Sequence, residues 1–370
     1  MKRRLVIFIC VFVTVISVLS GCGTQKNPLL WEKATNDYAS YRIPGIVATK
    51  EGTLLTYCEA RRSTEDWADI DIQMRRSTDQ GKTWSDPVIL GDSIPSGTRN
   101  NPVMLVDSNN KIHMIISYKY GISMAGGKVY YLSSEDDGVT WSEPEDITDQ
   151  TQGGSVRHAQ FACGPSHGIE LKDGTLVFPF WFVEEKDFTE KTNNSPSHIS
   201  TLYSKDSGKT WQIGEVLDIE EGITDPSEPC IVQLSTGEVM LNVRVGGIET
   251  SLRGVAVSPD GISGWSKIRY EEQLRDPGCE GSIVRYDDST ILFTNCNMER
   301  SVADKDRLNL TVRYSKDDGK TWSAGTVVCE SDSMYSDMAV IGEKIFVVYE
   351  EGFYDGLSIR LKEYKLSDIQ

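Results

Sequence analysis

One eight-residue pattern recurs along the chain and constrains its fold more than any other feature. Four segments have the form Ser-x-Asp-x-Gly-x-Thr-Trp and begin at Ser77, Ser134, Ser204 and Ser315, and a degenerate copy begins at Ser258. In chain order, these serines are separated by 57, 70, 54 and 57 residues. Repetition at a long and nearly regular period is typical of folds that are built from repeated structural units.

Each copy has the composition of a hairpin turn. The Asp side chain can accept hydrogen bonds from N–H groups within its own turn, and Gly takes the positive φ that the turn needs. Thr and Trp then start the next strand, and the Trp ring is large enough to pack between neighbouring sheets. Runs of β-forming residues precede the four full copies, at 70–75, 129–133, 198–203 and 308–314.

This spacing predicts the fold class. Short strands at regular intervals, with helical periodicity nearly absent, indicate an all-β chain. Residues 22–370 number 349, and dividing by the period of 57 gives about 6.1. We therefore expect a six-bladed β-propeller of four-stranded antiparallel sheets. The repeats alone do not indicate an enzyme, because such turns also occur in propellers that catalyse nothing.

The N-terminal 22 residues have the features of an export signal. Basic residues at 2–4 precede an apolar run at 5–19, which is shorter than the roughly 20 residues of a membrane-spanning helix. The tetrapeptide Leu-Ser-Gly-Cys at 19–22 resembles a bacterial lipobox, in which Cys22 is lipidated and becomes the new N-terminus. The alternative is an ordinary cleaved signal with an accidental cysteine. We expect a lipoprotein signal peptide over 1–22, a short spacer over 23–30 and one propeller domain over 31–370.

Acyl chains on Cys22 would hold the protein on a membrane face of the bacterial cell envelope, at the surface or in the periplasm, without a spanning helix. No other segment is apolar enough to cross a bilayer. Excluding Cys10 and Cys22, the remaining cysteines are widely spaced and contain no C-x-x-C pair: Cys58, Cys163, Cys230, Cys279, Cys296 and Cys329. We expect most of them to be buried and unpaired, with one disulfide still possible in an exported protein.

Charge and motif content narrow the classes of partner. A net charge of −17 argues against nucleic acid as a ligand. The four histidines lack metal-ligand spacing, and neither a Walker motif nor a dinucleotide-binding motif is present. The sequence therefore predicts no metal and no organic cofactor. We expect a monomer.

A series of motifs resembles, in order, those of the sialidase family. The octapeptides resemble its Asp boxes, and Tyr41-Arg42-Ile43-Pro44 matches its [FY]-R-I-P signature. The further matches are DWADIDIQMRRS (66–77), FACGPSHGIEL (161–171), SEP (227–229) with LNVR (241–244), CEGS (279–282) where Glu replaces the usual Gln, RLNLTVR (307–313), YSD (335–337) and YE (349–350). The resemblance covers about residues 40 to 352. It implies an exo-α-sialidase, a glycoside hydrolase that removes terminal sialic acids from glycoproteins, glycolipids and oligosaccharides.

Sialic acids carry a carboxylate on the anomeric carbon, so such an enzyme must bind that carboxylate. Arginine offers a planar fork that pairs bidentately with a carboxylate and stays charged at any working pH. The resemblance assigns this role to Arg42, Arg244 and Arg307. Because these arginines would lie inside a cleft, their local positive charge is compatible with an acidic outer surface.

The resemblance also assigns the catalytic groups. An anionic nucleophile would be repelled by the substrate carboxylate, whereas a neutral tyrosine that is deprotonated as it attacks avoids this cost. Tyr335 matches the nucleophile and Glu228 its base, and the residues flanking Tyr335 indicate an exposed loop. Asp66, on a loop before a strand, is the candidate general acid. Asp69 and Asp71 are rivals that we place on the strand itself.

Arg61 resembles the residue that contacts the ring hydroxyl region of the sugar, and Arg62 is its alternative. The implied reaction retains anomeric configuration through a tyrosyl-glycoside, which makes 31–370 the catalytic domain. The alternatives are a glycosidase for a related nonulosonic acid, a trans-sialidase, or a glycan-binding surface lipoprotein without turnover.

Overall fold

The structure, a computed structural model, describes residues 27–119, 127–153, 156–189, 195–246, 251–300, 307–353 and 356–370. Within these ranges the chain is all-β, apart from two short 3₁₀ helices, η1 (Thr148–Thr151) and η2 (Leu366–Asp368). The predicted all-β class is confirmed. The expected signal peptide and Cys22 lie outside the described residues. Among the residues described, no helix has the length and apolar content needed to span a membrane.

The strands form antiparallel sheets in which chain neighbours pair. Three sheets each run without interruption through one stretch of chain. The first consists of β10 (His158–Cys163), β12 (Leu176–Glu184), β13 (His198–Ser204) and β14 (Gln212–Ile213), with β11 (Ile169–Glu170) beside β12. The second consists of β15 (Thr224–Gln233), β16 (Val239–Gly246), β17 (Leu252–Ser258) and β18 (Arg269–Arg275). The third consists of β19 (Gly281–Arg285), β20 (Ile291–Cys296), β21 (Leu310–Ser315) and β22 (Thr326–Cys329).

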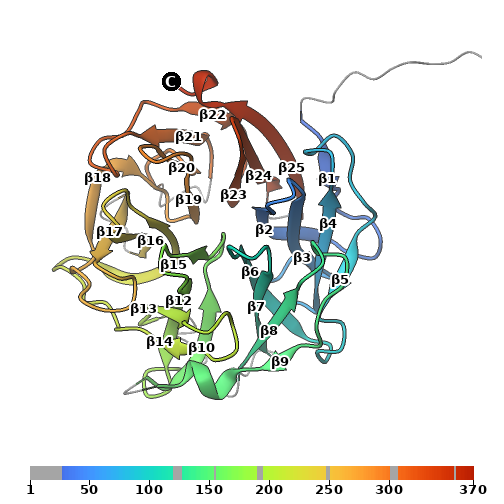
Figure 1. The fold of residues 1–370 in the computed structure, drawn as a ribbon, viewed down its shortest axis with the longest axis horizontal. Helices are drawn as coiled ribbons and strands as arrows, with labels where there is room; N and C mark the ends of the chain where they lie inside the picture. The colour runs from blue at the N-terminus through green and yellow to red at the C-terminus, as the bar shows by residue number, and fades with distance from the viewer. Residues whose placement is uncertain are drawn as a thin grey trace, which may run out of the picture.

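The fourth sheet joins the two ends of the described chain. Its order is β1 (Leu29–Trp31), β25 (Gly356–Lys365), β24 (Lys344–Phe353) and β23 (Ser336–Ile341). Strand β1 begins at Leu29 and therefore lies partly within the segment that we predicted to be a spacer. Because β1 pairs with β25, the N-terminal strand closes the ring of sheets (Figure 1).

The remaining strands form one eight-stranded sheet. They are β2 (Ser40–Ala48), β3 (Leu54–Arg61), β4 (Ile70–Ser77), β5 (Val88–Leu90), β6 (Thr98–Val106), β7 (Ile112–Lys119), β8 (Lys128–Ser134) and β9 (Glu145–Asp146). Its halves are joined by a parallel contact between Ile70 of β4 and Thr98 of β6.

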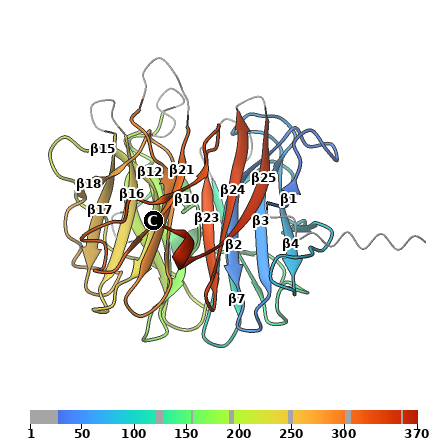
Figure 2. The same cartoon turned by 90° about the horizontal axis from the view of Figure 1, so that it is seen from above.

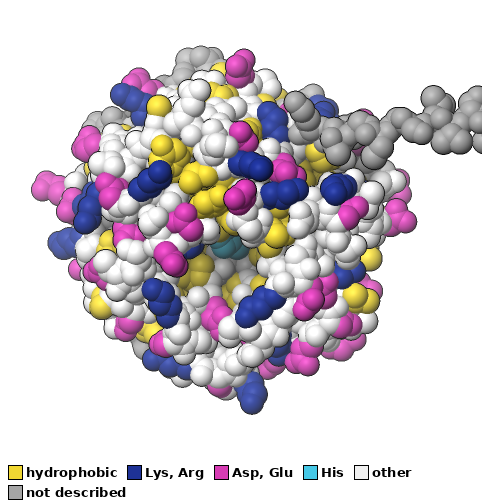
Figure 3. Space-filling model, turned by 45° about the horizontal axis from the view of Figure 1, so that its top comes forward, with side chains coloured by type: hydrophobic (Ala, Val, Ile, Leu, Met, Phe, Trp, Pro, Cys, Tyr) yellow, Lys and Arg dark blue, Asp and Glu magenta, His cyan; other side chains and the backbone are white. Residues whose placement is uncertain are grey.

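The sheets stand around a central axis in a propeller-like arrangement, which confirms that part of the prediction (Figure 1). Near the axis, β2 contacts β6 and β23, and β19 contacts β15 and β23. Seen at 90°, the strands run between the two faces of a thick disc (Figure 2). Figure 3 shows one face hollowed near its middle, with acidic and basic side chains spread around the hollow.

The repeated octapeptides form nearly identical turns, as predicted. In the first copy, Asp79 accepts hydrogen bonds from Thr83 N (2.9 Å) and Thr83 Oγ1 (2.6 Å), and Ser77 Oγ accepts one from Gly81 N (2.7 Å). Gln80 and Gly81 both have positive φ, 58° and 82°, which is the pattern that favours glycine in such turns.

Apolar clusters fill the spaces between neighbouring sheets and contain the tryptophans of the octapeptides. Trp211, for example, is buried in a cluster that joins residues of β6 to β8 with residues of β10 to β13. The prediction that these rings pack between sheets is therefore confirmed. All six cysteines in the described residues are buried and free.

Two irregularities at the inner strands bear on the site. The register of β2 against β3 shifts between Arg42 and Gly45, where Ile43 has a φ of 53°. The register of β15 against β16 shifts on both sides of Ser227, and Glu228 has a φ of 43°. Such bulges commonly redirect side chains next to active sites, and here they lie at Arg42 and Glu228.

Candidate active site

The predicted site residues belong to four different sheets and meet at one end of the central axis. Arg42 lies near the start of β2, Arg61 is the last residue of β3, and Asp66 lies on the β3–β4 loop. Glu228 lies on β15 and Arg244 on β16, where Arg244 pairs with Ser227. Arg307 precedes β21 and Tyr335 immediately precedes β23. The structure brings these seven residues into one cluster of contacts.

Tyr335 and Glu228 form the centre of this cluster. Tyr335 Oη donates a hydrogen bond to Glu228 Oε1, and Arg244 Nη1 contacts both Glu228 Oε2 (2.6 Å) and Tyr335 Oη (3.2 Å). The tyrosine lies on a loop, as expected, but the expected exposure was wrong. Only 5% of Tyr335 is exposed, because its ring packs with Ile43, Met334 and other apolar side chains.

Burial and charge set the protonation of this pair. Desolvation and the charge of Glu228 raise the pKa of Tyr335 well above its ordinary value, although the neighbouring arginines oppose the shift. Desolvation also acts to raise the pKa of Glu228, but Arg244 and the Tyr335 hydrogen bond outweigh it and the pKa is lowered. The pair is therefore a neutral tyrosine beside an ionised glutamate that can accept its proton.

The carboxylate of Glu350, a residue to which the sequence analysis gave no role, binds Arg42. Glu350 accepts hydrogen bonds from Arg42 Nε (3.1 Å) and Nη2 (3.3 Å), and also from the backbone N–H groups of Ile43 (2.8 Å) and Tyr335 (3.0 Å). One buried carboxylate thus fixes both a candidate carboxylate-binding arginine and the backbone of the candidate nucleophile. The guanidinium of Arg42 lies 5.0 Å from the centre of the Tyr335 ring.

Asp66 faces the same cluster from the β3–β4 loop. It accepts hydrogen bonds from Arg61 Nη1 (2.6 Å) and Arg42 Nη1 (3.4 Å), while 68% of its side chain is exposed. Arg61 is itself held by Glu59, with Nη2 2.6 Å from Oε2. Partial desolvation acts to raise the pKa of Asp66, but Arg61 and Arg42 outweigh it, so the pKa lies below its ordinary value.

The alternative candidates Arg62, Asp69 and Asp71 form contacts with one another and with residues outside the cluster. Arg62 binds Asp71 (2.7 Å) and Asp69 (3.3 Å). Asp71 also accepts hydrogen bonds from Arg99 Nη1 and Tyr38 Oη, and Asp69 accepts one from the backbone of Gly97. Among these candidates the geometry therefore places Asp66 and Arg61, rather than Asp69, Asp71 or Arg62, beside the arginine cluster.

Arg307 completes the cluster. Its Nη2 donates to the carbonyl oxygen of Gly278 at 3.2 Å, and its guanidinium lies 5.7 Å from the centre of the Tyr335 ring. Three guanidinium groups, from Arg42, Arg244 and Arg307, consequently surround one tyrosine. Within the described part of the chain, no group of His, Cys, Asp and Glu side chains is arranged to hold a metal ion.

Glu350 and Glu59 are the supporting residues that sequence reasoning missed. Glu350 is in the YE motif at 349–350, which matched the family pattern but carried no role. Glu59 lies two residues before Arg61 in a run of β-forming residues. Because residues two apart on a strand share a face, the sequence could have predicted that Glu59 pairs with Arg61.

The fold and the site together define a propeller-like protein with an arginine-lined site built around a tyrosine–glutamate pair. The model of the BNR repeat-like domain matches residues 52–347. The chain therefore belongs to the sialidase family whose members carry BNR, or Asp-box, repeats.

Individual sialidases show how far this likeness extends. The sialidase of Bacteroides fragilis is 30% identical over 369 residues, covering 90% of this chain and 63% of the relative. That of Micromonospora viridifaciens is 28% identical, covering 85% of this chain and 50% of the relative. The chain thus spans about half to three-fifths of the length of these two relatives. The solved structure of a Hadza microbial sialidase is similar with a TM-score of 0.80 and 28% identity, covering 93% of this chain and 69% of that one.

Proposed function

We propose that this protein is an exo-α-sialidase that hydrolyses terminal sialic acids of glycoconjugates with retention of anomeric configuration. The observation that carries the proposal is the hydrogen bond from Tyr335 Oη to Glu228 Oε1 within a ring of three arginines. The sialidases to which the chain is similar support the substrate class.

In the first step, Arg42, Arg244 and Arg307 bind the substrate carboxylate and so orient the anomeric carbon toward Tyr335. Tyr335 Oη forms a bond to that carbon while its proton passes to Glu228 Oε1. The bond to the departing sugar oxygen breaks, and Asp66 supplies a proton to that oxygen. Arg61 contacts the ring hydroxyl region. The arginine charges stabilise the anionic character that develops on Tyr335.

In the second step, the Asp66 carboxylate removes a proton from water, which attacks the anomeric carbon. The bond to Tyr335 Oη breaks, and the tyrosine regains its proton from Glu228. Two displacements at one carbon give net retention.

The sialidase fold is proposed to have six blades. Counting the eight-stranded sheet as two blades is supported by its single Ile70–Thr98 junction. It is also supported by an apolar cluster in which residues of β2 to β4 pack against residues of β6 to β8.

The catalytic domain is proposed to occupy 31–370, and lipidation of Cys22 after cleavage of the signal is proposed to anchor a monomer to the cell envelope. Replacing Cys22 by Ala would then move the protein from the detergent phase to the aqueous phase in a phase-partition experiment.

The direct test is release of 4-methylumbelliferone from its α-sialoside by the purified chain, beside a Tyr335→Phe variant. The wild type should turn over, and the variant should lose about 10³-fold or more in kcat, because a phenyl ring offers no nucleophile. Proton NMR of the first-formed sugar anomer tests retention. A folded wild type without turnover would contradict hydrolysis of this substrate and favour a related nonulosonic acid or a binding protein.

A further inference from the structure

One cation next to the catalytic cluster is withdrawn completely from solvent. Arg253 on β17 has 0% exposure, and its ion-pair partner Asp276 is also buried, with Nη1 3.2 Å from Oδ2. Removing two charges from water is strongly unfavourable unless their hydrogen-bonding capacity is used well. The contacts of this pair show what it holds in place.

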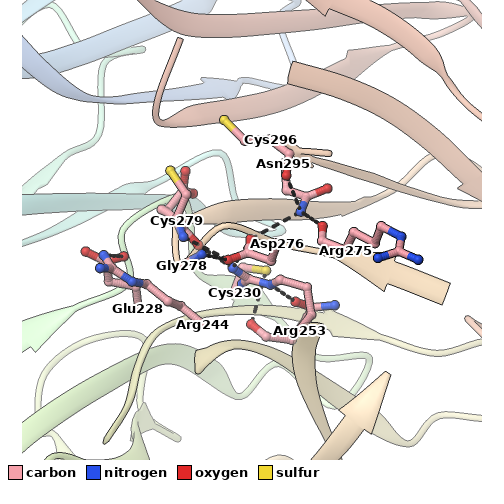
Figure 4. A network of polar contacts seen from close by, with 12 residues as sticks. Glu228, Cys230, Arg244, Arg253, Arg275, Asp276, Gly278, Cys279, Asn295 and Cys296 are labelled. Atoms are coloured by element: carbon pink, nitrogen blue, oxygen red, sulfur yellow. Dashed lines mark hydrogen bonds and ion pairs between the residues drawn. The ribbon is translucent and has the colours of Figure 1, made fainter. Parts of the chain in front are cut away.

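Arg253 connects two segments that belong to the site (Figure 4). Its Nε donates to Asn242 Oδ1 at 2.7 Å, and its Nη1 donates to the carbonyl oxygen of Cys279 at 2.5 Å. Asn242 lies two residues before Arg244 on β16, so both side chains lie on the same face of that strand. Arg253 thereby links the strand of Arg244 to the turn at 276–279.

Asp276 shapes that turn from inside. Its Oδ1 accepts hydrogen bonds from the backbone N–H groups of Gly278 (2.7 Å) and Cys279 (2.8 Å). The turn presents the carbonyl oxygen of Gly278 to Arg307 Nη2 at 3.2 Å. The position of Arg307 therefore depends on the turn, and the turn depends on the Arg253–Asp276 pair.

We propose that Arg253, together with Asp276, is a positioning residue for the carboxylate-binding arginines. It fixes the Gly278 carbonyl that orients Arg307 and braces the strand that carries Arg244. The inference rests on the proposed function. Arginine suits this role because its planar fork donates in two directions at once, whereas the ammonium group of a lysine is a compact point donor.

The first measurement compares KM and kcat of the full chain with those of its Arg253→Lys variant on the 4-methylumbelliferyl α-sialoside. We expect KM to rise about tenfold, the cost of weakening one charge-assisted hydrogen bond to the substrate carboxylate, with kcat changed by less than about threefold. The effect on kcat should be smaller because Arg253 donates to Asn242, Asp276 and Cys279 and acts on Tyr335 and Glu228 only through Arg244.

Arg285→Lys is the matched control. Arg285 lies at the far end of β19 from the 276–279 turn and contacts the Gln233 carbonyl and Asp318. Its replacement removes one partly buried guanidinium from the neighbouring sheet, at the end of β19 that lies away from the 276–279 turn. KM should stay at the wild-type value.

A double-mutant cycle separates positioning from general support of the fold. If Arg253 acts through Arg307, the Arg253→Lys substitution should have little further effect on KM in an Arg307→Lys background. Equal effects in both backgrounds would overturn the proposal, as would an unchanged KM in a folded Arg253→Lys variant. Absence of turnover by the wild type would instead contradict the proposed function.

Asp276→Asn provides a second route if Arg253→Lys does not fold. Asparagine keeps an oxygen that can accept from the turn but removes the charge that pairs with Arg253. We expect KM to rise at least about threefold, with circular dichroism and the thermal midpoint confirming a folded protein. If neither variant folds, Arg253 supports the whole fold rather than the arginine site, and the proposal is rejected.

Discussion

At the scale of single residues, the arginines around Asp66 favour its ionised form, whereas the proposed general acid must carry a proton. Arg61 and Arg42 bind it at 2.6 and 3.4 Å and hold its pKa below the ordinary value. Arg42 is also one of the groups proposed to bind the substrate carboxylate. An added anion at Arg42 and Arg307 would weaken the positive field at Asp66 and raise its pKa. Substrate binding would then prepare the acid that the reaction needs.

Binding of a sialic acid analogue should therefore be accompanied by proton uptake. Titration calorimetry with the unsaturated analogue 2-deoxy-2,3-didehydro-N-acetylneuraminic acid near pH 5, in buffers of different ionisation enthalpy, should show uptake of up to about one proton. Asp66→Asn should bind the analogue with less uptake. Equal uptake by the wild type and Asp66→Asn would show that another group takes the proton.

Glu350 leads to a second prediction at this scale. Glu350→Gln preserves shape but leaves buried Arg42 without its ionised partner, which should raise KM and lower the free energy of unfolding by about 3 kcal/mol. Glu351→Gln is the control, because Glu351 is the next residue on β24 and pairs instead with Arg360. Urea unfolding and sialoside kinetics on both variants check the prediction. Equal effects at 350 and 351 would contradict it.

At the scale of elements, the Asp box is a self-contained turn. In four copies, one Asp accepts hydrogen bonds from the N–H and hydroxyl of a Thr four residues later, as in Asp136 with Thr140 and Asp317 with Thr321. Hydrogen bonds from Thr83 lower the pKa of Asp79 to about 2, and the same cause lowers that of Asp136 to about 2. These turns lie at the ends of strands opposite to the site, so they serve the fold.

The boxes should therefore make the fold sensitive to acid. Because the pKa of Asp79 is lower in the folded state, its contribution is complete above the unfolded value of about 3.9 and is lost as the pH falls toward about 2. Asp79→Asn should reduce stability at pH 6 by about 1 kcal/mol and flatten the loss between pH 4 and 2. Urea midpoints across that range test this, with exposed Asp86→Asn as control. An unchanged acid slope would contradict the prediction.

At the scale of the whole molecule, Asp337 ties several sheets together at the axis. Its side chain accepts hydrogen bonds from Ile46 N of β2 (2.9 Å), Ser282 Oγ of β19 (2.7 Å) and His167 Nδ1 (2.8 Å). Burial acts to lower the pKa of His167, but the charge of Asp337 and its hydrogen bond outweigh this and raise the pKa. A buried, hydrogen-bonded His167–Asp337 pair therefore joins segments that are far apart in sequence.

This pair predicts a loss of stability in alkali. Because the folded pKa of His167 is raised, its contribution is complete below the unfolded value of about 6.5 and is lost as the pH rises through the folded value. His167→Asn should flatten the fall in unfolding free energy above pH 6.5. His113→Asn is the control. Because burial lowers the pKa of His113 to about 4, this substitution should change the pH dependence of stability below pH 6.5 and not above it. If His167→Asn left the alkaline slope unchanged, the pair would not be the cause.

The sequence by itself determined the all-β class, the turns and the tryptophans that pack between sheets. These features are local: Ser77, Asp79 and Thr83 contact one another within one turn, and β4 and β21 were placed to within two residues because the β-forming runs mark them directly. Family motifs also pointed to all seven members of the site cluster. The sequence favoured Arg61 and Asp66 but kept Arg62, Asp69 and Asp71 as alternatives, because residues of the same type lie close together in this part of the chain. The structure places Arg61 and Asp66 beside Arg42.

Only the tertiary structure decided which distant residues support the site. Glu350 lies 308 residues from Arg42 and 15 from Tyr335, yet it contacts both. Arg253 meets Asp276 because β17 pairs with β18, with Leu252 opposite Arg275. The turn after β18 then presents the Gly278 carbonyl to Arg307, where neighbouring sheets converge. The burial of Tyr335 follows from the same convergence, since its flanking serines and aspartate suggest exposure until neighbouring sheets cover the loop. Contacts of this kind depend on how whole sheets pack, and no local pattern of residues encodes that packing.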